Sequence, residues 1–376
     1  MSARALYLHI PFCRRRCNYC DFVTHQIDGF NAETQKAYCQ ALLTEIGLRG
    51  GADNLTSIYL GGGTPTALPP ALLCGLLAAL RPLAAPAAEI TVEANPCTLD
   101  YDYLQALRRA GVSRLSLGVQ SFDDTKLQQM GRLHTAEQAR QAFTAARAAG
   151  FDNISLDLIY ALPGQSQDDL QSDIKQALAL KPEHISLYGL TLSPNSPWGR
   201  QFKAGELALP DDEQSAALQE LIFSKLKQAG YEHYEIANFA LDGTKKSRHN
   251  CAYWHREDYL GAGAGAAGAL GDYRYTNKGE VAAYLEALRQ GKLPPAEDER
   301  LSAEQVRAEA LILALRLAEG ADLFALSVRY NFDFLSAYGA TLRELVAIGL
   351  LDECEGLFAL TDKGILLANE VFVRLI

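Results

Sequence analysis

The sequence predicts an α/β protein in which a partial (β/α) barrel precedes a C-terminal helical domain of winged-helix-like shape. Two observations support this fold class. Short runs of branched and aromatic residues alternate with amphipathic helical stretches through the first two thirds of the 376-residue chain. The segments AGVSRLSL, AGFDNISL and AGYEHYEI also repeat one helix-to-strand unit, with a glycine at each helix end. Repeated β/α units imply right-handed crossovers and a parallel sheet, closed or partly closed as a barrel.

Six strands are predicted in this first part, each with the composition of a buried parallel strand. They span residues 5–10, 57–62, 89–94, 114–120, 154–160 and 184–190. Two of the helix starts between them carry clear signals. TAEQ, from residue 135, is a capping box, and SQDD, from residue 166, is a related opening.

The organisation changes near residue 278, where helix follows helix and DECEGLFALT predicts a small β-ribbon. We therefore expect a barrel over 1–240, a connecting segment over 241–277 and a helical domain over 278–376. A winged-helix shape often indicates DNA binding, which needs clustered lysine and arginine. Residues 301–376 instead hold six basic and eleven acidic residues, a net charge of −5. We interpret this domain as a packing or lid domain.

The bulk composition is that of a globular chain with 48% hydrophobic residues and a formal net charge of −10. No apolar run is long enough to span a membrane, and the first residues lack the features of a secretory signal. We expect a cytoplasmic protein that does not bind nucleic acid. Eight cysteines in that compartment do not form a disulfide framework. Five are scattered and expected to be small, inert core residues: Cys39, Cys74, Cys97, Cys251 and Cys354.

Three cysteines stand close together in CRRRCNYC, at positions 13, 17 and 20. They follow the first strand, so we expect them at the barrel face where chemistry takes place. A closed zinc site needs four ligands, and His9 or His25 could complete one. Alternatively, Cys13, Cys17 and Cys20 could hold a four-iron cluster and leave one iron open, as at a reactive site. The three intervening arginines either stabilise the thiolates or form a solvated loop face.

Glycines and polar residues mark the ends of later strands. GGGTP, at 61–65, would let backbone approach a ligand closely, although an ordinary strand-to-helix turn has the same composition. Glu93, Gln120 and Asp157 come late in the third, fourth and fifth strands, and Arg132 follows in MGRLH. One such residue is usually a structural cap. Four of them converging on one barrel face suit a polar cofactor.

Together these motifs resemble the radical S-adenosylmethionine family, whose signature is C-x3-C-x2-C with an aromatic residue before the last cysteine. YLHIPFC, GGGTPT, VEANP, LSLGVQSF, MGRLH and SLDLIYALPGQS extend the resemblance along the chain, to the branch that contains oxygen-independent coproporphyrinogen III dehydrogenase. The resemblance implies a 4Fe-4S cluster on Cys13, Cys17 and Cys20, with S-adenosylmethionine chelating the open iron. The other residues it implies beside the cluster or S-adenosylmethionine are Tyr7, Tyr19, Gly62, Gly63, Thr64, Glu93, Gln120, Arg132 and Asp157.

Within this branch the chain resembles the haem chaperones more than the dehydrogenase. The dehydrogenase carries a further cysteine where Phe22 stands, and a long extension before the first strand, which here begins almost at once. HNCAYW, at 249–254, is similar to a chaperone motif whose histidine is taken as a haem contact. The resemblance implies a protein that binds haem through His249 and delivers it to acceptor proteins. If S-adenosylmethionine is cleaved, it also implies an electron donor such as flavodoxin or ferredoxin.

Several alternatives stay open. A histidine beside two aromatic residues is more often packed and hydrogen-bonded than a ligand, and Cys251 is a rival iron ligand. The chain could be an enzyme instead, either the dehydrogenase or a tetrapyrrole-acting methyltransferase. A purely structural zinc or iron–sulfur protein is disfavoured by the strand-end motifs. GAGAAG, at 263–268, matches a dinucleotide-binding pattern, but no apolar strand is predicted before it, so we interpret it as a close-packed turn under the site.

Overall fold

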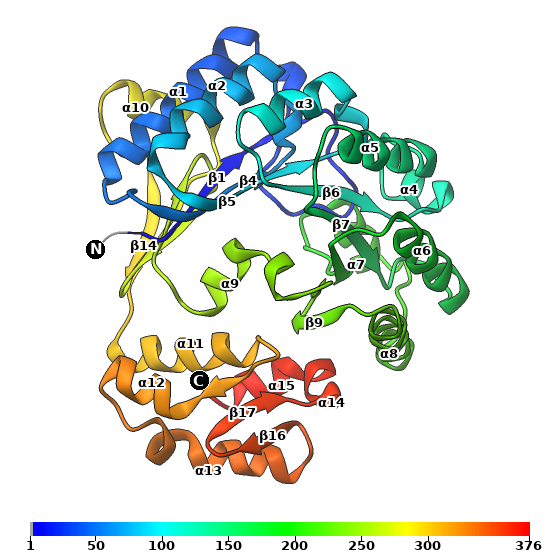
Figure 1. The fold of residues 1–376 in the computed structure, drawn as a ribbon, viewed down its shortest axis with the longest axis vertical. Coiled ribbons are helices and arrows are strands. Elements are labelled where there is room, and N and C mark those ends of the chain that lie inside the picture. The colour runs from blue at the N-terminus through cyan, green and yellow to red at the C-terminus, as the bar shows by residue number, and fades with distance from the viewer. Residues whose placement is uncertain (1–2) are drawn as a thin grey trace.

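A curved sheet of twelve strands forms the barrel part of the protein, in a computed structural model that describes residues 3–376 (Figure 1). The seven middle strands run parallel to one another. Across the sheet they extend from the strand that begins at residue 259, through the N-terminal strand, to the strand that ends at residue 189. Antiparallel strands extend the sheet at both ends. In order across the sheet the strands are β14 (Ala296–Arg300), β13 (Tyr273–Asn277), β12 (Ala267–Leu270), β11 (Tyr259–Ala262), β1 (Ala5–Ile10), β4 (Leu55–Gly62), β5 (Ala84–Ala94), β6 (Arg114–Gln120), β7 (Ile154–Tyr160), β8 (His184–Gly189), β10 (Asn238–Ala240) and β9 (Glu232–Glu235).

All six predicted strands are present, and the predicted fold class is confirmed. The largest difference is at β5, which begins at Ala84 rather than at residue 89. Its first residues, AAPAA, lack the branched side chains that predict a strand. They are extended because Ala84 pairs with Leu55 of β4, a contact that no local pattern reveals.

Helices cover the outer face of the parallel strands (Figure 1). They are α1 (Ala32–Arg49), α2 (Pro70–Leu80), α3 (Tyr101–Arg109), α5 (Ala136–Ala148), α6 (Gln167–Leu180) and α8 (Asp212–Gln228). Two shorter helices, α4 (Asp124–Gln129) and α7 (Pro197–Lys203), contribute Leu127 and Trp198 to a small apolar cluster separate from the main core. Both predicted helix openings are capping boxes, at Thr135 with Gln138 and at Ser166 with Asp169. Each box satisfies two backbone N–H groups that the first helical turn leaves without partners.

The two faces of the parallel strands differ in chemistry, because successive side chains of a strand point to opposite sides. On β6, Leu115, Leu117 and Val119 belong to the main apolar core beneath the helices. The alternate residues line the inside of the barrel: Arg114, Ser116, Gly118 and Gln120. A closed (β/α)8 barrel usually fills its interior with branched aliphatic side chains. This interior is polar and holds a cavity.

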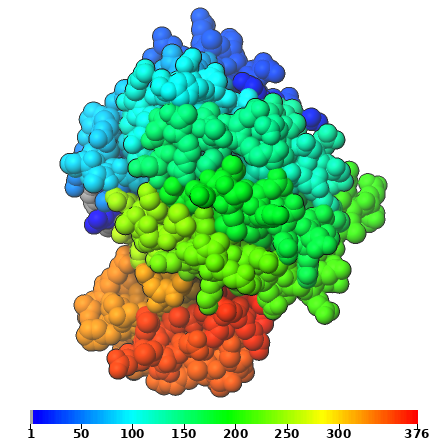
Figure 2. Space-filling model, turned by 45° about the vertical axis from the view of Figure 1, so that its right-hand side comes forward, coloured from blue at the N-terminus to red at the C-terminus, as the bar shows by residue number. Residues whose placement is uncertain are grey.

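The C-terminal part forms a second lobe with its own apolar core, seen in orange and red in Figure 2. It contains α11 (Ala303–Leu315), α12 (Leu323–Tyr330), α13 (Phe334–Ala347), α14 (Asp362–Leu366), α15 (Ala368–Val373) and a sheet of β15 (Ala321–Asp322), β17 (Leu357–Leu360) and β16 (Leu351–Cys354). The predicted ribbon is the β16–β17 pair.

Two further helices belong to neither set: one lies between the barrel and the C-terminal lobe, and the other lies at the barrel edge. Helix α9 (Arg248–Trp254) lies on the concave side of the sheet, facing the C-terminal lobe, and α10 (Val281–Arg289) packs beside α1 (Figure 1). Strands β11 to β14 extend the barrel sheet as far as Arg300. We therefore propose that the helical domain begins near residue 301 rather than at 278. Within residues 3–376, none of the helices combines the length and hydropathy needed to span a bilayer.

Candidate functional site

The three clustered cysteines lie on a loop that reaches into the cavity of the barrel. Cys13 ends the short strand β2 (Phe12–Cys13), which pairs with β3 (His25–Gln26) and so closes the loop. All three cysteines are half-buried with free thiols, and all three line a cavity of about 380 Å³. The structure thus brings Cys13, Cys17 and Cys20 to one surface.

Contacts from distant segments hold this loop in place. The Asn18 N–H donates to the Met130 carbonyl, and the Trp198 N–H donates to the Asn18 carbonyl, both at 2.9 Å. The Tyr19 ring contacts that of Trp198, with 6.2 Å between centroids. Tyr19 and Trp198 belong to a small apolar cluster separate from the main core. The loop therefore packs on this small cluster, which includes Leu127 of α4 and Trp198 of α7, and not on the main core.

Two polar side chains approach the thiols. Arg132 donates through Nη1 to Cys17 Sγ at 3.5 Å, and Thr64 Oγ1 lies 3.5 Å from Cys13 Sγ. Burial raises the pKa of the Cys13 thiol and raises that of Cys20 to about 11. Bound iron would reverse this, because a coordinated thiol is deprotonated outright. Arg132 is the cation best placed to support the resulting negative charge.

The zinc alternative finds little support in the donor groups near the loop. His9 Nε2 lies 2.8 Å from the carbonyl oxygen of Val23, and His25 Nε2 lies 3.0 Å from that of Gly279. Both histidines are therefore engaged with backbone carbonyls rather than directed at the thiols. Three thiols around one cavity fit the donor set of a cluster that leaves one iron open.

The GGGTP turn lies directly beside the cysteine loop. The N–H groups of Gly63 and Thr64 donate to the carbonyls of Ile10 and Phe12. A Cβ at Gly63 would meet these two carbonyl oxygens at 2.7 and 2.8 Å, and Gly62 has φ +99°. Only glycine fits both positions. Gly62, Gly63 and Thr64 all line the cavity, so the turn presents backbone to a ligand.

Glu93 and Asp157 are the two carboxylates of the cavity. Glu93 accepts from the Tyr59 hydroxyl at 2.7 Å and from the Gly62 N–H at 3.1 Å. Asp157 accepts from the hydroxyls of Ser116 at 2.8 Å and Ser155 at 3.0 Å. Burial raises the pKa of both groups, and that of Glu93 to about 7. A positively charged ligand would relieve this desolvation cost.

Gln120 and Arg132 complete the set of predicted strand-end residues in the cavity. Gln120 has φ +69°, a left-handed conformation that is uncommon for a residue other than glycine. Such strain tends to occur at binding sites. Arg132 Nε is buried without a hydrogen-bond partner in the described residues, and Nη2 donates to the Gly118 carbonyl. Two buried carboxylates, exposed turn backbone and an unpaired donor fit the zwitterionic sulfonium S-adenosylmethionine.

The strand-end prediction missed several cavity residues. They are Tyr59 on β4, Arg114 and Ser116 on β6, Ser186 and Tyr188 on β8, and Asn250 on α9. The sequence of the strands does contain a pattern that predicts the strand residues of this set. Polar or small residues recur there at every second position, which places them on one face. The strands were interpreted by their overall apolar content, which describes only the outer face.

Two predicted site residues do not line the cavity. The Tyr7 hydroxyl lies 3.1 Å from His9 Nδ1. His249 is 1% exposed, with Nδ1 2.9 Å from Ser57 Oγ and Nε2 2.8 Å from the Tyr253 hydroxyl. The ring of Tyr59, which does line the cavity, stacks on the His249 ring at 5.0 Å.

His249 is therefore a packed, hydrogen-bonded histidine in this structure. Burial, and next the charge of Arg114, lower its pKa to about 3, so its ring is neutral. One face of the Trp254 ring is also covered, because the Arg316 guanidinium lies 4.4 Å from the ring centroid. Cys251 is half-buried, and burial raises its pKa to about 12. No residue of the motif except Asn250 reaches the cavity within the described chain.

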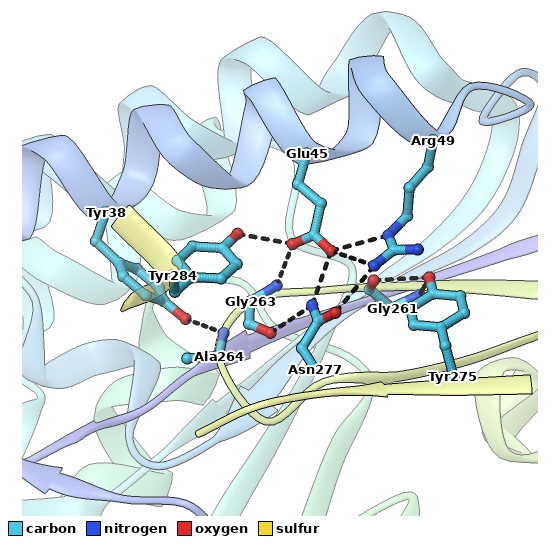
Figure 3. Close-up of polar contacts among 9 residues, drawn as sticks. All are labelled: Tyr38, Glu45, Arg49, Gly261, Gly263, Ala264, Tyr275, Asn277 and Tyr284. Carbon is cyan, nitrogen blue, oxygen red and sulfur yellow. Dashed lines mark hydrogen bonds and ion pairs between the residues drawn. The ribbon is translucent and has the colours of Figure 1, made fainter. Parts of the chain in front are cut away.

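GAGAAG forms the turn between β11 and β12 and the start of β12, and Figure 3 shows Gly263 and Ala264 of this turn. A Cβ at Gly265 would meet the Val23 side chain at 2.8 Å, and the Gly263 N–H donates to the buried Glu45 at 2.9 Å. The expectation that no strand precedes this motif was wrong, because β11 does. A strand follows the turn where a dinucleotide site needs a helix, so the interpretation as a close-packed turn agrees with the geometry.

Comparison with known proteins agrees with this architecture. A family model described as the radical SAM superfamily matches residues 7–177, and one described as the HemN C-terminal domain matches residues 301–367. The solved structure of coproporphyrinogen III oxidase (HemN) from Escherichia coli, a radical SAM enzyme, has a TM-score of 0.83 and 26% identity. That match covers 100% of this chain and 90% of the other. Fold and site together define a radical SAM protein, a class that implies a 4Fe-4S cluster and S-adenosylmethionine.

Curated relatives narrow the assignment. The haem chaperone HemW of Bacillus subtilis is 37% identical, and the match covers 98% of each chain. HemW of Lactococcus lactis is 38% identical and that of E. coli 34%, each covering 98% of this chain and 96% of the relative. The chain therefore belongs to the HemW family.

Proposed function

We propose that this protein binds haem and delivers it to acceptor proteins, and that it uses a radical SAM site to do so. The observation that supports this most is the end-to-end similarity to several relatives named haem chaperone HemW. A second feature is Phe22, which is 61% exposed and lines the cavity. It occupies the position at which the resemblance places a further cysteine in the dehydrogenase of this branch.

In this proposal Cys13, Cys17 and Cys20 hold a 4Fe-4S cluster at the open end of the barrel. The cluster, when bound, supplies an iron with an open coordination position and a source of single electrons. Arg132 donates to Cys17 Sγ and so stabilises thiolate charge on the loop. The apolar cluster around Trp198 keeps the loop against the cavity wall.

The second part of the proposal concerns S-adenosylmethionine. Gly62, Gly63 and Thr64 present backbone beside the cysteine loop and would bind its methionine group. Glu93 and Asp157 would attract the positive charge of the ligand, and Gln120 would add hydrogen bonds. Hydroxyl donors already orient both carboxylates, from Tyr59 to Glu93 and from Ser116 to Asp157. The carboxylates are thus fixed before the ligand arrives.

We further propose His249 as a haem ligand, in line with the motif resemblance. Ligation would require His249 Nε2 to exchange the Tyr253 hydroxyl for iron, because the two lie 2.8 Å apart here. The neutral state of the ring favours this exchange, since only neutral imidazole binds a metal. Cys251 is the competing ligand, disfavoured by the raised pKa of its thiol.

The deciding experiment is haem titration of anaerobically purified, cluster-loaded protein, followed by visible spectra and transfer to apo-myoglobin as a test acceptor. We expect saturable binding near one haem per chain and transfer of the haem. Coproporphyrinogen III, assayed with S-adenosylmethionine and a reductant, should give no vinyl product. Product formation at enzyme-like turnover would replace the chaperone with the dehydrogenase, and absence of haem binding would refute the chaperone function.

Two further parts of the proposal concern the surroundings of the protein. We propose a cytoplasmic location, supported by eight free cysteines, which suit a reducing compartment. We also propose flavodoxin or ferredoxin as the electron donor if S-adenosylmethionine is cleaved. Cell fractionation tests the first, and reduction of the cluster by each donor, followed by electron paramagnetic resonance, tests the second.

A further inference from the structure

Arg114 is a buried cation that makes no ion pair with a carboxylate anywhere in residues 3–376. It is 2% exposed. It is the first residue of β6, and its side chain lies on the face of the strand that lines the cavity. Its one hydrogen bond runs from Nη2 to His184 Nδ1 at 3.2 Å, and Nε has no partner. A buried guanidinium normally has its charge and its donors satisfied.

His184 cannot balance this charge. Its Nδ1 lies 3.2 Å from Arg114 Nη2 and 2.8 Å from Ser155 Oγ, and its Nε2 lies 2.8 Å from the Tyr234 hydroxyl. Burial, and next the charge of Arg114, lower the pKa of His184 well below its usual value. The ring is therefore neutral.

The nearest carboxylates belong to other partners. Asp157 accepts from two serine hydroxyls, and Glu89 accepts from the His249 N–H at 3.4 Å. Neither lies within ion-pair distance of Arg114 in the described residues, although their charges raise its pKa against the lowering effect of burial.

A second buried arginine shows how this protein satisfies such a group elsewhere. Arg49 pairs with the fully buried carboxylate of Glu45 at 2.8 Å and donates to Asn277 Oδ1 at 2.9 Å (Figure 3). Glu45 in turn accepts from Asn277, Tyr284 and the Gly263 N–H. This network is complete without a ligand. Arg114 has no carboxylate at ion-pair distance within the described residues, and it lines the cavity.

Other donors lie around the same part of the cavity. The side-chain amide of Asn250 makes no hydrogen bond within the described residues, and it lines the cavity together with Arg114, Ser186 and Tyr188. Asn250 follows His249 on helix α9, and the ring of Tyr59, which also lines the cavity, stacks on the His249 ring at 5.0 Å. A guanidinium and an amide that line one cavity without satisfying each other can both donate to a planar carboxylate.

We propose that Arg114, with Asn250, binds a carboxylate of the second ligand of this cavity, namely a propionate side chain of the haem. This inference rests on the proposed haem function. The methionine carboxylate of S-adenosylmethionine is the other possible source. Arg114 begins the strand that Gln120 ends, so their Cα atoms lie roughly 20 Å apart, at about 3.3 Å per residue. The cysteine loop and the GGGTP turn lie at the Gln120 end, where S-adenosylmethionine belongs.

The test compares haem with haem dimethyl ester, whose propionates carry no charge, on wild-type, Arg114→Met and Arg114→Lys proteins. Wild type should bind haem roughly tenfold to a hundredfold more tightly than the ester, as expected for one charge-assisted contact. Arg114→Met should lose that preference, and Arg114→Lys should keep part of it. S-adenosylmethionine affinity should be the same in all three, which also reports correct folding.

Each other outcome has a clear meaning. Equal binding of haem and its ester by wild type overturns the carboxylate receptor and leaves the haem function intact. A loss of S-adenosylmethionine affinity in Arg114→Met, with the ester preference unchanged, assigns the arginine to the methionine carboxylate and also overturns the proposal. If wild type binds neither haem nor ester, the proposed function fails, and the propionate site fails with it.

Discussion

The cysteine loop and helix α9 carry the two ligand motifs of this sequence, and the structure treats them in opposite ways. The three thiols of the loop are half-buried and face one cavity. The imidazole of α9 is 1% exposed, and both its nitrogens have partners. A motif can therefore contain a residue type suited to ligation and still not show whether its side chain is available to a ligand.

The difference comes from how each segment is packed. The loop has little regular backbone pairing, and the side chains of its three cysteines line the cavity. Helix α9 is covered on two sides. His249 packs against Tyr59 of β4, and Trp254 packs under Arg316 of the C-terminal lobe. A helix held between two layers must satisfy its polar side chains internally.

The largest effect should follow from removing the thiols. Replacing Cys13, Cys17 and Cys20 together by alanine should abolish cluster binding, because no other thiolates line the cavity among the described residues. Iron and sulfide analysis after anaerobic reconstitution measures this. Cys354→Ala, at an exposed cysteine of β16, is the control and should retain the full cluster. A triple variant with wild-type iron content would rule out the loop as the cluster site.

The pH dependence of stability should show the burial of Glu93. Its pKa is about 7 in the folded protein and 4.5 in its usual range, so the folded state keeps a proton that the unfolded state has lost. The contribution of Glu93 to stability is therefore fully present below pH 4.5 and is lost as the pH rises to 7. In Glu93→Gln this fall should be smaller by about 2 to 3 kcal/mol, since one pKa unit corresponds to about 1.4 kcal/mol.

Urea unfolding at several pH values measures this difference. Glu235 and Asp173 also have raised pKa values, but they contribute equally to wild type and variant. Parallel curves for the two proteins would show that the Glu93 carboxylate is not desolvated.

His249→Ala should lower the free energy of unfolding by about 2 kcal/mol. It removes a buried ring and leaves the hydroxyls of Ser57 and Tyr253 without their hydrogen-bond partner. The loss should shrink as the pH falls from 6.5 towards 3. In that range the unfolded state of wild type gains a proton on this ring that the folded state does not. His255→Ala is the control, because its side chain is 46% exposed and pairs only with Glu319. Equal losses would contradict the packed role of His249.

The smallest effect concerns the Tyr253 hydroxyl. If His249 ligates haem, Tyr253→Phe should strengthen haem binding about fivefold, because it removes a competing hydrogen bond of about 1 kcal/mol. His249→Ala should weaken binding and change the visible spectrum. Titrations that are identical for wild type and both variants would place the haem ligand outside α9. The cysteine loop would then be the only one of the two motifs that binds a ligand.

Much of the fold follows from local patterns. The strand from Ala5 to Ile10 and that from Arg114 to Gln120 have their predicted bounds, and Thr135 caps the predicted helix. These features depend on residues within a few positions of one another. Strand β11 was missed because YLGA is short and follows a charged stretch. It is held as a strand by parallel pairing with β1, about 250 residues earlier in the chain.

The same distinction applies to the site. The ends of the strands predicted Glu93, Gln120 and Asp157, because parallel strands bring their carboxyl ends to one edge. Arg114 and Tyr59 were missed although each occupies an inward position on its strand. Their place in the cavity depends on the barrel having an open, polar interior, and an aliphatic interior would have excluded them.

The sequence by itself determined the chemical types and the order of the motifs: three thiols on one loop, a glycine turn, and carboxylates at strand ends. Only the tertiary structure decided which polar groups keep hydrogen-bonding capacity for a ligand. His249 loses that capacity to Ser57, 192 residues away along the chain. Arg114 keeps it, since its neighbour His184 is neutral and no carboxylate in the described residues pairs with it. The physical reason is that hydrogen-bond satisfaction and burial belong to the neighbours a residue meets in space, and sequence spacing does not specify them.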